Sequence, residues 1–234
     1  MNEFNKHTSR KFNEELESVR NSVLKMGGLV EEMLTQALHG FFQGDSQVCT
    51  NVIAMDDQVN DLELEIDDEC RRILATRAPA AIDLRLIMAI IKTITDIERM
   101  GDEAEKIARL SINLLESTEI NKADHLEIQT MGELVQTMTK KSLDAFARFD
   151  SELALATFRS DEMVDSQYES LSRSSITHMM EDPRSITKRL NIMWIARALE
   201  RIGDHSKNIC EYVIYTEKGL DIRHAEEQVG VGHE

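Results

Sequence analysis

The sequence Glu98-Arg99-Met100-Gly101-Asp102 occurs again, with one change, as Glu200-Arg201-Ile202-Gly203-Asp204, 102 positions later. In each copy the two acidic residues are four positions apart, so a helix would carry both carboxylates on one side. Like charges at this spacing destabilise a helix by about 0.2–0.5 kcal/mol, and a glycine inside a helix costs about 1 kcal/mol relative to alanine. Because both features reduce helix stability, we infer that an interaction outside the helix compensates for them.

The composition predicts an all-α protein that does not bind nucleic acid. The 234 residues include only two prolines and ten glycines, and 41% of them are hydrophobic, which is enough for a core. A formal net charge of −16 argues against nucleic-acid binding, which needs a basic surface, and fits a cation site or a basic protein partner. The three cysteines lie far apart, and no apolar run approaches the roughly 20 residues that span a bilayer. We therefore expect a soluble, cytoplasmic protein.

Apolar residues recur at helical spacing in six segments, which are separated by capping residues, prolines or polar stretches. No segment shows the alternation that is typical of a strand. We expect helices over residues 9–42, 45–78, 79–117, 124–149, 151–180 and 183–216. The tail, residues 217–234, loses this periodicity and is expected to be mobile.

The two halves of the chain are similar to each other. Residues 26–45 and 131–150, at an offset of 105, are identical at eight of twenty positions. Pro79 returns as Pro183 at an offset of 104, and the Glu-Arg-x-Gly-Asp motif has an offset of 102. We therefore predict a tandem duplication of a three-helix bundle, with two similar antiparallel bundles over residues 8–120 and 121–216.

Each half holds two acidic pairs with four-residue spacing, on two different helices. Aligned at offsets of 104 and 102, the pairs are Asp57 and Asp61, Glu98 and Asp102, Asp161 and Asp165, and Glu200 and Asp204. Carboxylates that converge repel one another unless a proton or a cation neutralises them. All-oxygen ligands favour magnesium, manganese or iron over a zinc–thiolate site. These eight residues are therefore candidate metal ligands.

The helical periodicity supports these sites only in part. Glu98 and Asp102 lie one position from the core stripe of their helix, at the boundary between core and solvent. Asp57 and Asp61 point away from the core stripe of their helix, so a metal there would lie on the outer surface of the bundle. Solvated acids that bind no metal are the alternative that the periodicity leaves open.

The doubled motif, the paired acids and the segment Pro79-Ala80-Ala81-Ile82-Asp83-Leu84-Arg85 together resemble the PhoU family of phosphate-specific transport accessory proteins, over about residues 8–216. The second half departs from the family's proline-then-Asp-Leu-Arg signature, so the role of that signature is assigned to the first half alone. The resemblance implies two three-helix bundles with surface metal clusters, held by the eight acids named above. The identity of the metal, whether iron, manganese, magnesium or zinc, stays open.

The same resemblance implies a function and partners. Members of the family repress the phosphate-starvation (Pho) response when phosphate is plentiful. They link the Pst phosphate importer, through its ATPase subunit PstB, to the sensor histidine kinase PhoR, and they commonly form homodimers. We expect a non-catalytic adaptor that reaches the membrane only through its partners. The alternatives are a metal-dependent hydrolase, for which the sequence offers no identifiable base or nucleophile, and a helical scaffold without metal.

Overall fold

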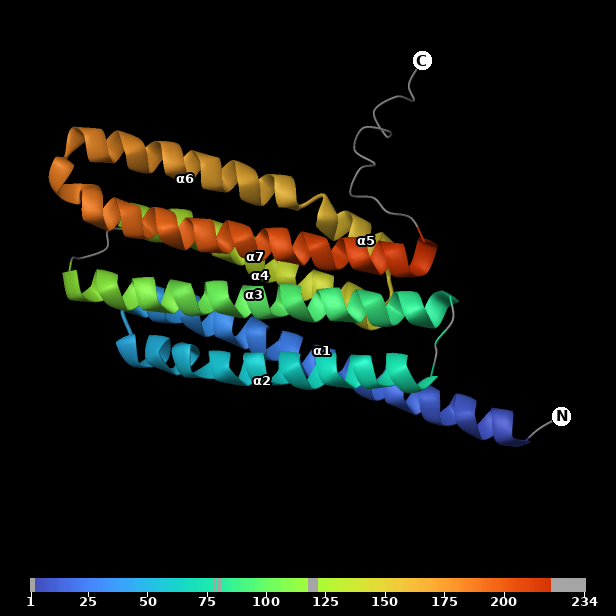
Figure 1. Ribbon diagram of the computed structural model, residues 1–234. Helices are drawn as coiled ribbons and strands as arrows, with labels where there is room; N and C mark the ends of the chain where they lie inside the picture. The colour runs from blue at the N-terminus through green and yellow to red at the C-terminus, as the bar shows by residue number, and fades with distance from the viewer. Residues whose placement is uncertain (1–2, 78, 80, 118–121, 220–234) are drawn as a thin grey trace, which may run out of the picture.

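The computed structural model describes residues 3–77, 79, 81–117 and 122–219 (Figure 1). The elements are α1 (Glu3–Gln43), α2 (Ser46–Arg77), α3 (Ala81–Ser117), α4 (Lys122–Arg148), α5 (Ser151–Phe158), α6 (Asp161–Glu181), the short 3₁₀ helix η1 (Pro183–Ser185) and α7 (Ile186–Lys218). The predicted all-α fold is confirmed. Residues 220–234, which make up most of the predicted mobile tail, lie outside the described residues.

Several helix boundaries follow local signals in the sequence. Gly44 takes a left-handed conformation after α1, with φ of 69°, and Gly219 does the same after α7, with φ of 68°. Asp45 Oδ1 accepts hydrogen bonds from the backbone N–H groups two and three residues on, at 3.0 and 3.1 Å, and so caps α2. Asp182 accepts a bond of 3.1 Å from the N–H group two residues on and starts η1, with proline next to it.

The single helix predicted over residues 151–180 is wrong, because the structure divides this segment into α5 and α6. At the break, the Ser160 hydroxyl donates to the carbonyl oxygen of Thr157 at 2.5 Å. The change of direction places Asp161 against α7, where its side chain is 4% exposed and pairs with a lysine. Since neither glycine nor proline occurs at the break, the sequence alone did not indicate it.

The helices form two bundles that pack against each other as one body. Helices α1, α2 and α3 pack pairwise, and α4 and α7 pack with α5 and α6. The bundles meet where α3 packs on α7 and where α1 packs on α4; Figure 1 shows α3 and α7 side by side, with α2 and α6 at opposite outer edges. Buried residues of both halves, such as Ile97 and Ile195, belong to one continuous core. Among the described residues, no helix carries an apolar stretch long enough to cross a membrane.

The contact between α1 and α4 is reciprocal, as a duplication predicts. A Cβ atom added to Gly27 would lie 2.9 Å from Leu143 Cδ2, and one added to Gly132 would lie 2.9 Å from Leu38 Cδ1. Gly27 corresponds to Gly132, and Leu38 to Leu143, at the offset of 105. Two equivalent leucines thus pack on two equivalent glycines across an approximate twofold relation, and the absence of side chains at the glycines lets the helices approach closely.

Two adjacent glycines of α1 give a matched test of this close approach. Gly28→Ala is expected to raise the free energy of unfolding by about 0.5–1 kcal/mol, because alanine favours the helix and nothing lies within 4 Å of the added methyl group. Gly27→Ala should lose this gain, because its methyl group displaces Leu143. Urea denaturation of both variants measures the difference. Equal stabilisation would show that α1 and α4 are not in close contact.

Candidate functional site

Helices α2 and α3 bring a group of acidic side chains together on the surface of the first bundle. We call Asp56, Glu98, Asp102 and Glu105 the first cluster. Burial raises the pKa of Asp56, as do Asp102 and Glu105, which lie close to it. Burial also raises the pKa of Glu98, with further contributions from Asp102, Glu63 and Asp56. The pKa of Asp102 is raised by desolvation and then by Glu105. The carboxylates therefore repel one another when all are ionised.

Asp56 brings a buried carboxylate oxygen to this cluster. Its Oδ2 accepts a hydrogen bond of 3.0 Å from Asn60 Nδ2, whereas its buried Oδ1 has no hydrogen-bond partner. A Cβ atom added to Gly101 would lie 3.4 Å from this Oδ1. The glycine of the repeated motif therefore leaves space beside a buried carboxylate oxygen that has no partner, which is an unfavourable state unless something else binds there.

Asp57 and Asp61, the residues of α2 predicted as metal ligands, lie on the exposed face of that helix, as their position away from the core stripe predicted, and their metal binding stays a prediction. The alignment at an offset of 104 was wrong by one residue. Gly101 faces Asp56 and Val59 of α2, and the equivalent Gly203 faces Asp161 and Val164 of α6. The residues of α2 and α6 are therefore related by an offset of 105. Asp56 therefore corresponds to Asp161, and Asn60 to Asp165. Extending the offset of 105 that relates residues 26–45 to 131–150 would have found Asp56 from the sequence.

The second bundle carries the equivalent group between α6 and α7. We call Asp161, Asp165, Glu200 and Asp204 the second cluster, and all four were predicted. Burial raises the pKa of Glu200 to about 7, with a further contribution from Asp204. Burial and Asp161 raise the pKa of Asp204, and burial and Asp161 likewise raise that of Asp165. Glu200 is only 8% exposed and Asp165 lies at the exposed edge, so this cluster reaches from the core boundary to the solvent.

Two basic side chains lie among the acids of the second cluster. Lys207 Nζ is 2.9 Å from Asp161 Oδ2, and Arg197 Nη1 donates to Glu200 Oε1 at 2.5 Å. The other oxygen of each carboxylate, Asp161 Oδ1 and Glu200 Oε2, is buried without a hydrogen-bond partner. As in the first cluster, carboxylate oxygens are held in the protein with part of their bonding capacity unused.

The α3–α7 interface contains a third polar group, which sequence reasoning did not find. Asp96 Oδ1 is 2.7 Å from His205 Nδ1 and accepts a bond of 3.0 Å from Asn208 Nδ2. Arg201 of the repeated motif pairs with Glu103 of the other bundle, with Nη1 2.6 Å from Oε1. These residues were not detectable from spacing, because their partners lie in the opposite half of the chain. Their role is to join the two bundles directly next to the clusters.

The two clusters fit a divalent cation by charge and by donor chemistry. They offer carboxylate oxygens alone, three of which, on Asp56, Asp161 and Glu200, are buried and lack partners. In the part of the chain that the structure describes, however, no three histidine, cysteine, aspartate or glutamate side chains are already arranged as a metal site. Carboxylates at the exposed edge would therefore have to turn inward to complete the coordination of an ion.

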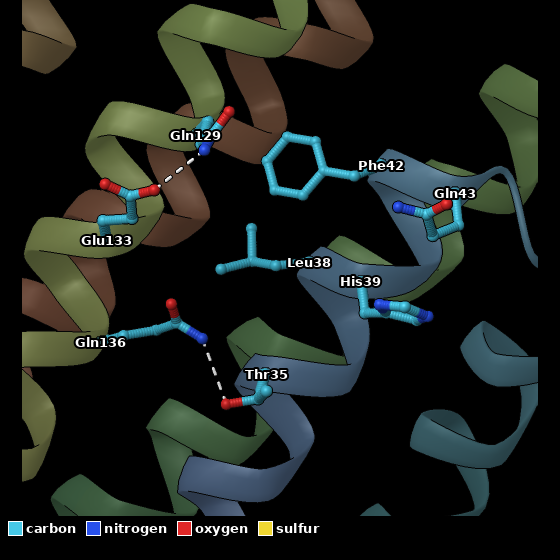
Figure 2. Close-up of a pocket in the computed structure, with 8 residues that line it drawn as sticks. All are labelled: Thr35, Leu38, His39, Phe42, Gln43, Gln129, Glu133 and Gln136. Carbon is cyan, nitrogen blue, oxygen red and sulfur yellow. Dashed lines mark hydrogen bonds between the residues drawn. The ribbon is translucent and has the colours of Figure 1, made fainter.

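A cavity of about 360 Å³ between α1 and α4 lies apart from these clusters (Figure 2). Its lining consists of Thr35, Leu38, His39, Phe42, Gln43, Gln129, Glu133 and Gln136. Two of its amide groups already donate to the wall, Gln136 to Thr35 Oγ1 at 3.1 Å and Gln129 to Glu133 Oε1 at 2.9 Å. Since one acidic residue lines it, the cavity is a poorer cation site than either cluster.

Comparison with known proteins gives a consistent result for both halves. The model of the PhoU domain matches residues 23–111 and residues 128–213, one match in each half. The phosphate-specific transport system accessory protein PhoU homolog of Pseudomonas aeruginosa is 50% identical over 218 residues, which cover 93% of this chain and 90% of the relative. The accessory protein PhoU of Escherichia coli strain K12 is 43% identical over 220 residues, or 94% of this chain and 90% of the relative.

Solved structures agree with this assignment. The crystal structure of PhoU from Pseudomonas aeruginosa matches with a TM-score of 0.87 at 50% identity, over 89% of this chain and 100% of that one. That of the phosphate transport system regulatory protein PhoU from Streptococcus pneumoniae matches with a TM-score of 0.82 at 31% identity, over 90% and 98%. The fold and the sequence thus agree across both halves, and the chain belongs to the PhoU family.

Proposed function

We propose that this protein is a non-catalytic regulator of phosphate uptake that represses the Pho response when phosphate is plentiful. The observation that carries this proposal is a match over nearly the full length, at 50% identity, to a relative named as an accessory protein of the phosphate-specific transport system. The Streptococcus pneumoniae neighbour, titled a regulatory protein of the phosphate transport system, supports a regulatory role. Neither name describes an enzyme, which agrees with the non-catalytic role expected from the sequence.

The proposed mechanism is that of an adaptor between two membrane partners. One partner is the Pst transporter, contacted at its ATPase subunit PstB, and the other is the PhoR-type sensor kinase. To repress the response, the protein must bind the non-phosphorylating state of the kinase more tightly than the phosphorylating state, because only a difference in affinity shifts an equilibrium. The long helices of both bundles provide the surfaces for these contacts. Assembly as a homodimer in the cytoplasm stays a prediction, which light scattering and cell fractionation can test.

The regulatory role can be tested by gene deletion in the source strain. We expect alkaline phosphatase activity in phosphate-rich medium to be high without the gene and to return to a low level when the gene is restored. Activity in phosphate-poor medium, which should be high in both strains, is the control. Low activity in phosphate-rich medium after deletion would contradict the repressor role.

We further propose that each cluster binds a divalent cation. The first cluster would hold it with Asp56, Glu98 and Asp102, and the second with Asp161, Asp165, Glu200 and Asp204. A bound cation would neutralise the repulsion among these carboxylates and link α2 to α3, or α6 to α7. The proposal is supported by the buried oxygens without partners and by the raised pKa values of Asp56, Glu98, Glu200 and Asp204.

Adjacent aspartates of α2 provide a matched test of the first cluster. Asp56→Asn is expected to lower the amount of manganese that the purified protein retains, because it removes a ligand charge from the cluster. Asp57→Asn, which makes the same change on the exposed face, should leave retention unchanged. Metal content after equilibrium dialysis, measured by mass spectrometry, gives the comparison, with the double variant Glu98→Gln and Asp102→Asn as the reference for a disabled cluster. Manganese retention equal to that of the unmodified protein in all three variants would rule out the site.

A further inference from the structure

The two clusters differ at one position that the duplication should have made equivalent. Glu105 follows Asp102 by three residues, and Lys207 follows Asp204 by three residues. The two positions are related by the same offset of 102 as the repeated motif. Residues three apart lie on the same face of a helix, so each side chain is directed toward the cluster of its own bundle. One bundle therefore has an acid where the other has a base.

Lys207 is held inside the second cluster. Its ammonium is 2.9 Å from Asp161 Oδ2, and Asp161 is almost fully buried, with a side chain that is 4% exposed. The same ammonium lies 4.9 Å from the centre of the Phe158 ring, a contact that a cation favours. It also lowers the pKa values of Asp165 and Asp204, against the larger effects that raise them. Lys207 thus interacts with three of the four acids.

Glu105 has the opposite effect in the first cluster. It raises the pKa of Asp56 and of Asp102, so it adds negative potential to the site. Arg109 pairs with Glu105, with Nη2 2.6 Å from Oε1, but the Arg109 side chain is 59% exposed and solvent screens its charge. Oδ1 is buried without a partner in both Asp56 and Asp161, but Oδ2 of Asp56 accepts from the neutral amide of Asn60, whereas Oδ2 of Asp161 pairs with an ammonium. Arg201 and Arg99 also lower the pKa of Asp102, but Arg99 is exposed and Arg201 pairs with Glu103, so the first cluster is less neutralised by its own protein.

We propose that Lys207 acts as a tethered cation that occupies the second cluster, so that this cluster binds a divalent ion more weakly than the first cluster does. The inference rests on the cation-binding role proposed above. An ion entering the second cluster must displace the ammonium from Asp161 and then remain close to a positive charge. At the first cluster an incoming ion meets an additional carboxylate instead. Near a protein surface, one charge at such short range changes an affinity by about tenfold or more.

The test measures manganese binding to single-cluster forms of the full chain, with free Mn²⁺ detected by electron paramagnetic resonance. Asp56→Asn leaves the second cluster as the better site, and Asp161→Asn leaves the first. We expect the Asp56→Asn protein to bind Mn²⁺ about tenfold more weakly than the Asp161→Asn protein does. Adding Lys207→Gln to Asp56→Asn should strengthen binding by about tenfold, and adding Lys207→Arg should not.

Two controls separate a local effect from a general one. Lys140→Gln makes the same charge change on the α1–α4 side of the molecule, where Lys140 lines a small cavity, and should leave Mn²⁺ binding unchanged. Adding Glu105→Gln to Asp161→Asn should weaken binding, because it removes the additional carboxylate of the first cluster. Circular dichroism of each variant confirms that the helices are retained.

Each result bears on a different proposal. Equal Mn²⁺ affinity in the two single-cluster proteins, or binding that Lys207→Gln leaves unchanged, would overturn the role of Lys207 while preserving cation binding. No Mn²⁺ binding by the unmodified protein would overturn both proposals about cations. Neither result would affect the repressor role, which the alkaline phosphatase measurement tests separately.

Discussion

Asp96→Ala is expected to lower the free energy of unfolding by about 2–3 kcal/mol, which corresponds to a fall in melting temperature of roughly 4–10 °C for a chain of this size. Asp96 is 4% exposed, and its Oδ1 binds both His205 and Asn208 across the α3–α7 interface. Removing the carboxylate leaves two polar groups of the opposite bundle without their partner. A buried group in that state loses the hydrogen bond and does not regain its hydration. Thermal unfolding followed by circular dichroism measures the change.

The exposed Asp57 supplies the matched control for this prediction. Asp57→Ala should change the melting temperature by less than about 2 °C, because surface substitutions of this kind are usually worth less than 0.5 kcal/mol. The double variant Asp96→Ala and His205→Ala should be less destabilised than the sum of its single variants, since the two residues share one interaction. Additive effects, or a small effect of Asp96→Ala, would show that this contact does not hold the bundles together.

The second large effect is an increase in stability as the pH falls, when a chelator is present. Burial and Asp204 raise the pKa of Glu200 from 4.5 to about 7, so the folded protein binds a proton there more tightly than the unfolded chain does. The resulting stabilisation is fully present below pH 4.5 and is lost as the pH rises through 7. We expect the melting temperature to be about 3–6 °C higher at pH 5 than at pH 8, which corresponds to roughly 1–2 kcal/mol.

Substitutions on α6 and α7 assign this effect to Glu200. Glu200→Gln replaces the carboxylate with a neutral group of the same size, so it should raise the melting temperature at pH 8 and change it little at pH 5. Glu162→Gln, at an exposed position of α6, should leave the pH profile as it is. A profile that rises from pH 5 to pH 8 in chelator would contradict the prediction. Arg77 lowers the pKa of Glu15, so the ion pair between these two residues stabilises the fold only while Glu15 is ionised. Stability should therefore fall again below about pH 4.5.

The sequence by itself determined the fold class, the duplication, two of the four acids of the first cluster and all four acids of the second. Helices could be predicted because a helix with one buried face repeats its apolar residues at fixed spacing, and caps such as Asp45 and Gly219 act within a few residues of the chain. The repeated Glu-Arg-x-Gly-Asp motif placed Glu98 and Glu200 correctly, because each motif lies within a single helix and its geometry is local. The same local reasoning showed that Asp57 and Asp61 point away from the core stripe.

Only the tertiary structure decided which residues meet across helices. Asp56 and Asp57 are identical in type, and one position along a helix turns a side chain by about 100°. An offset of 105 selects Asp56 and an offset of 104 selects Asp57, so the contact with Gly101 was needed to choose between the two alignments. The contact of Asp161 in α6 with Lys207 in α7 likewise joins residues that lie far apart in the chain. Periodicity describes which face of a helix is buried, whereas the identity of its neighbour depends on how separate helices pack, and that is a non-local property of the folded chain.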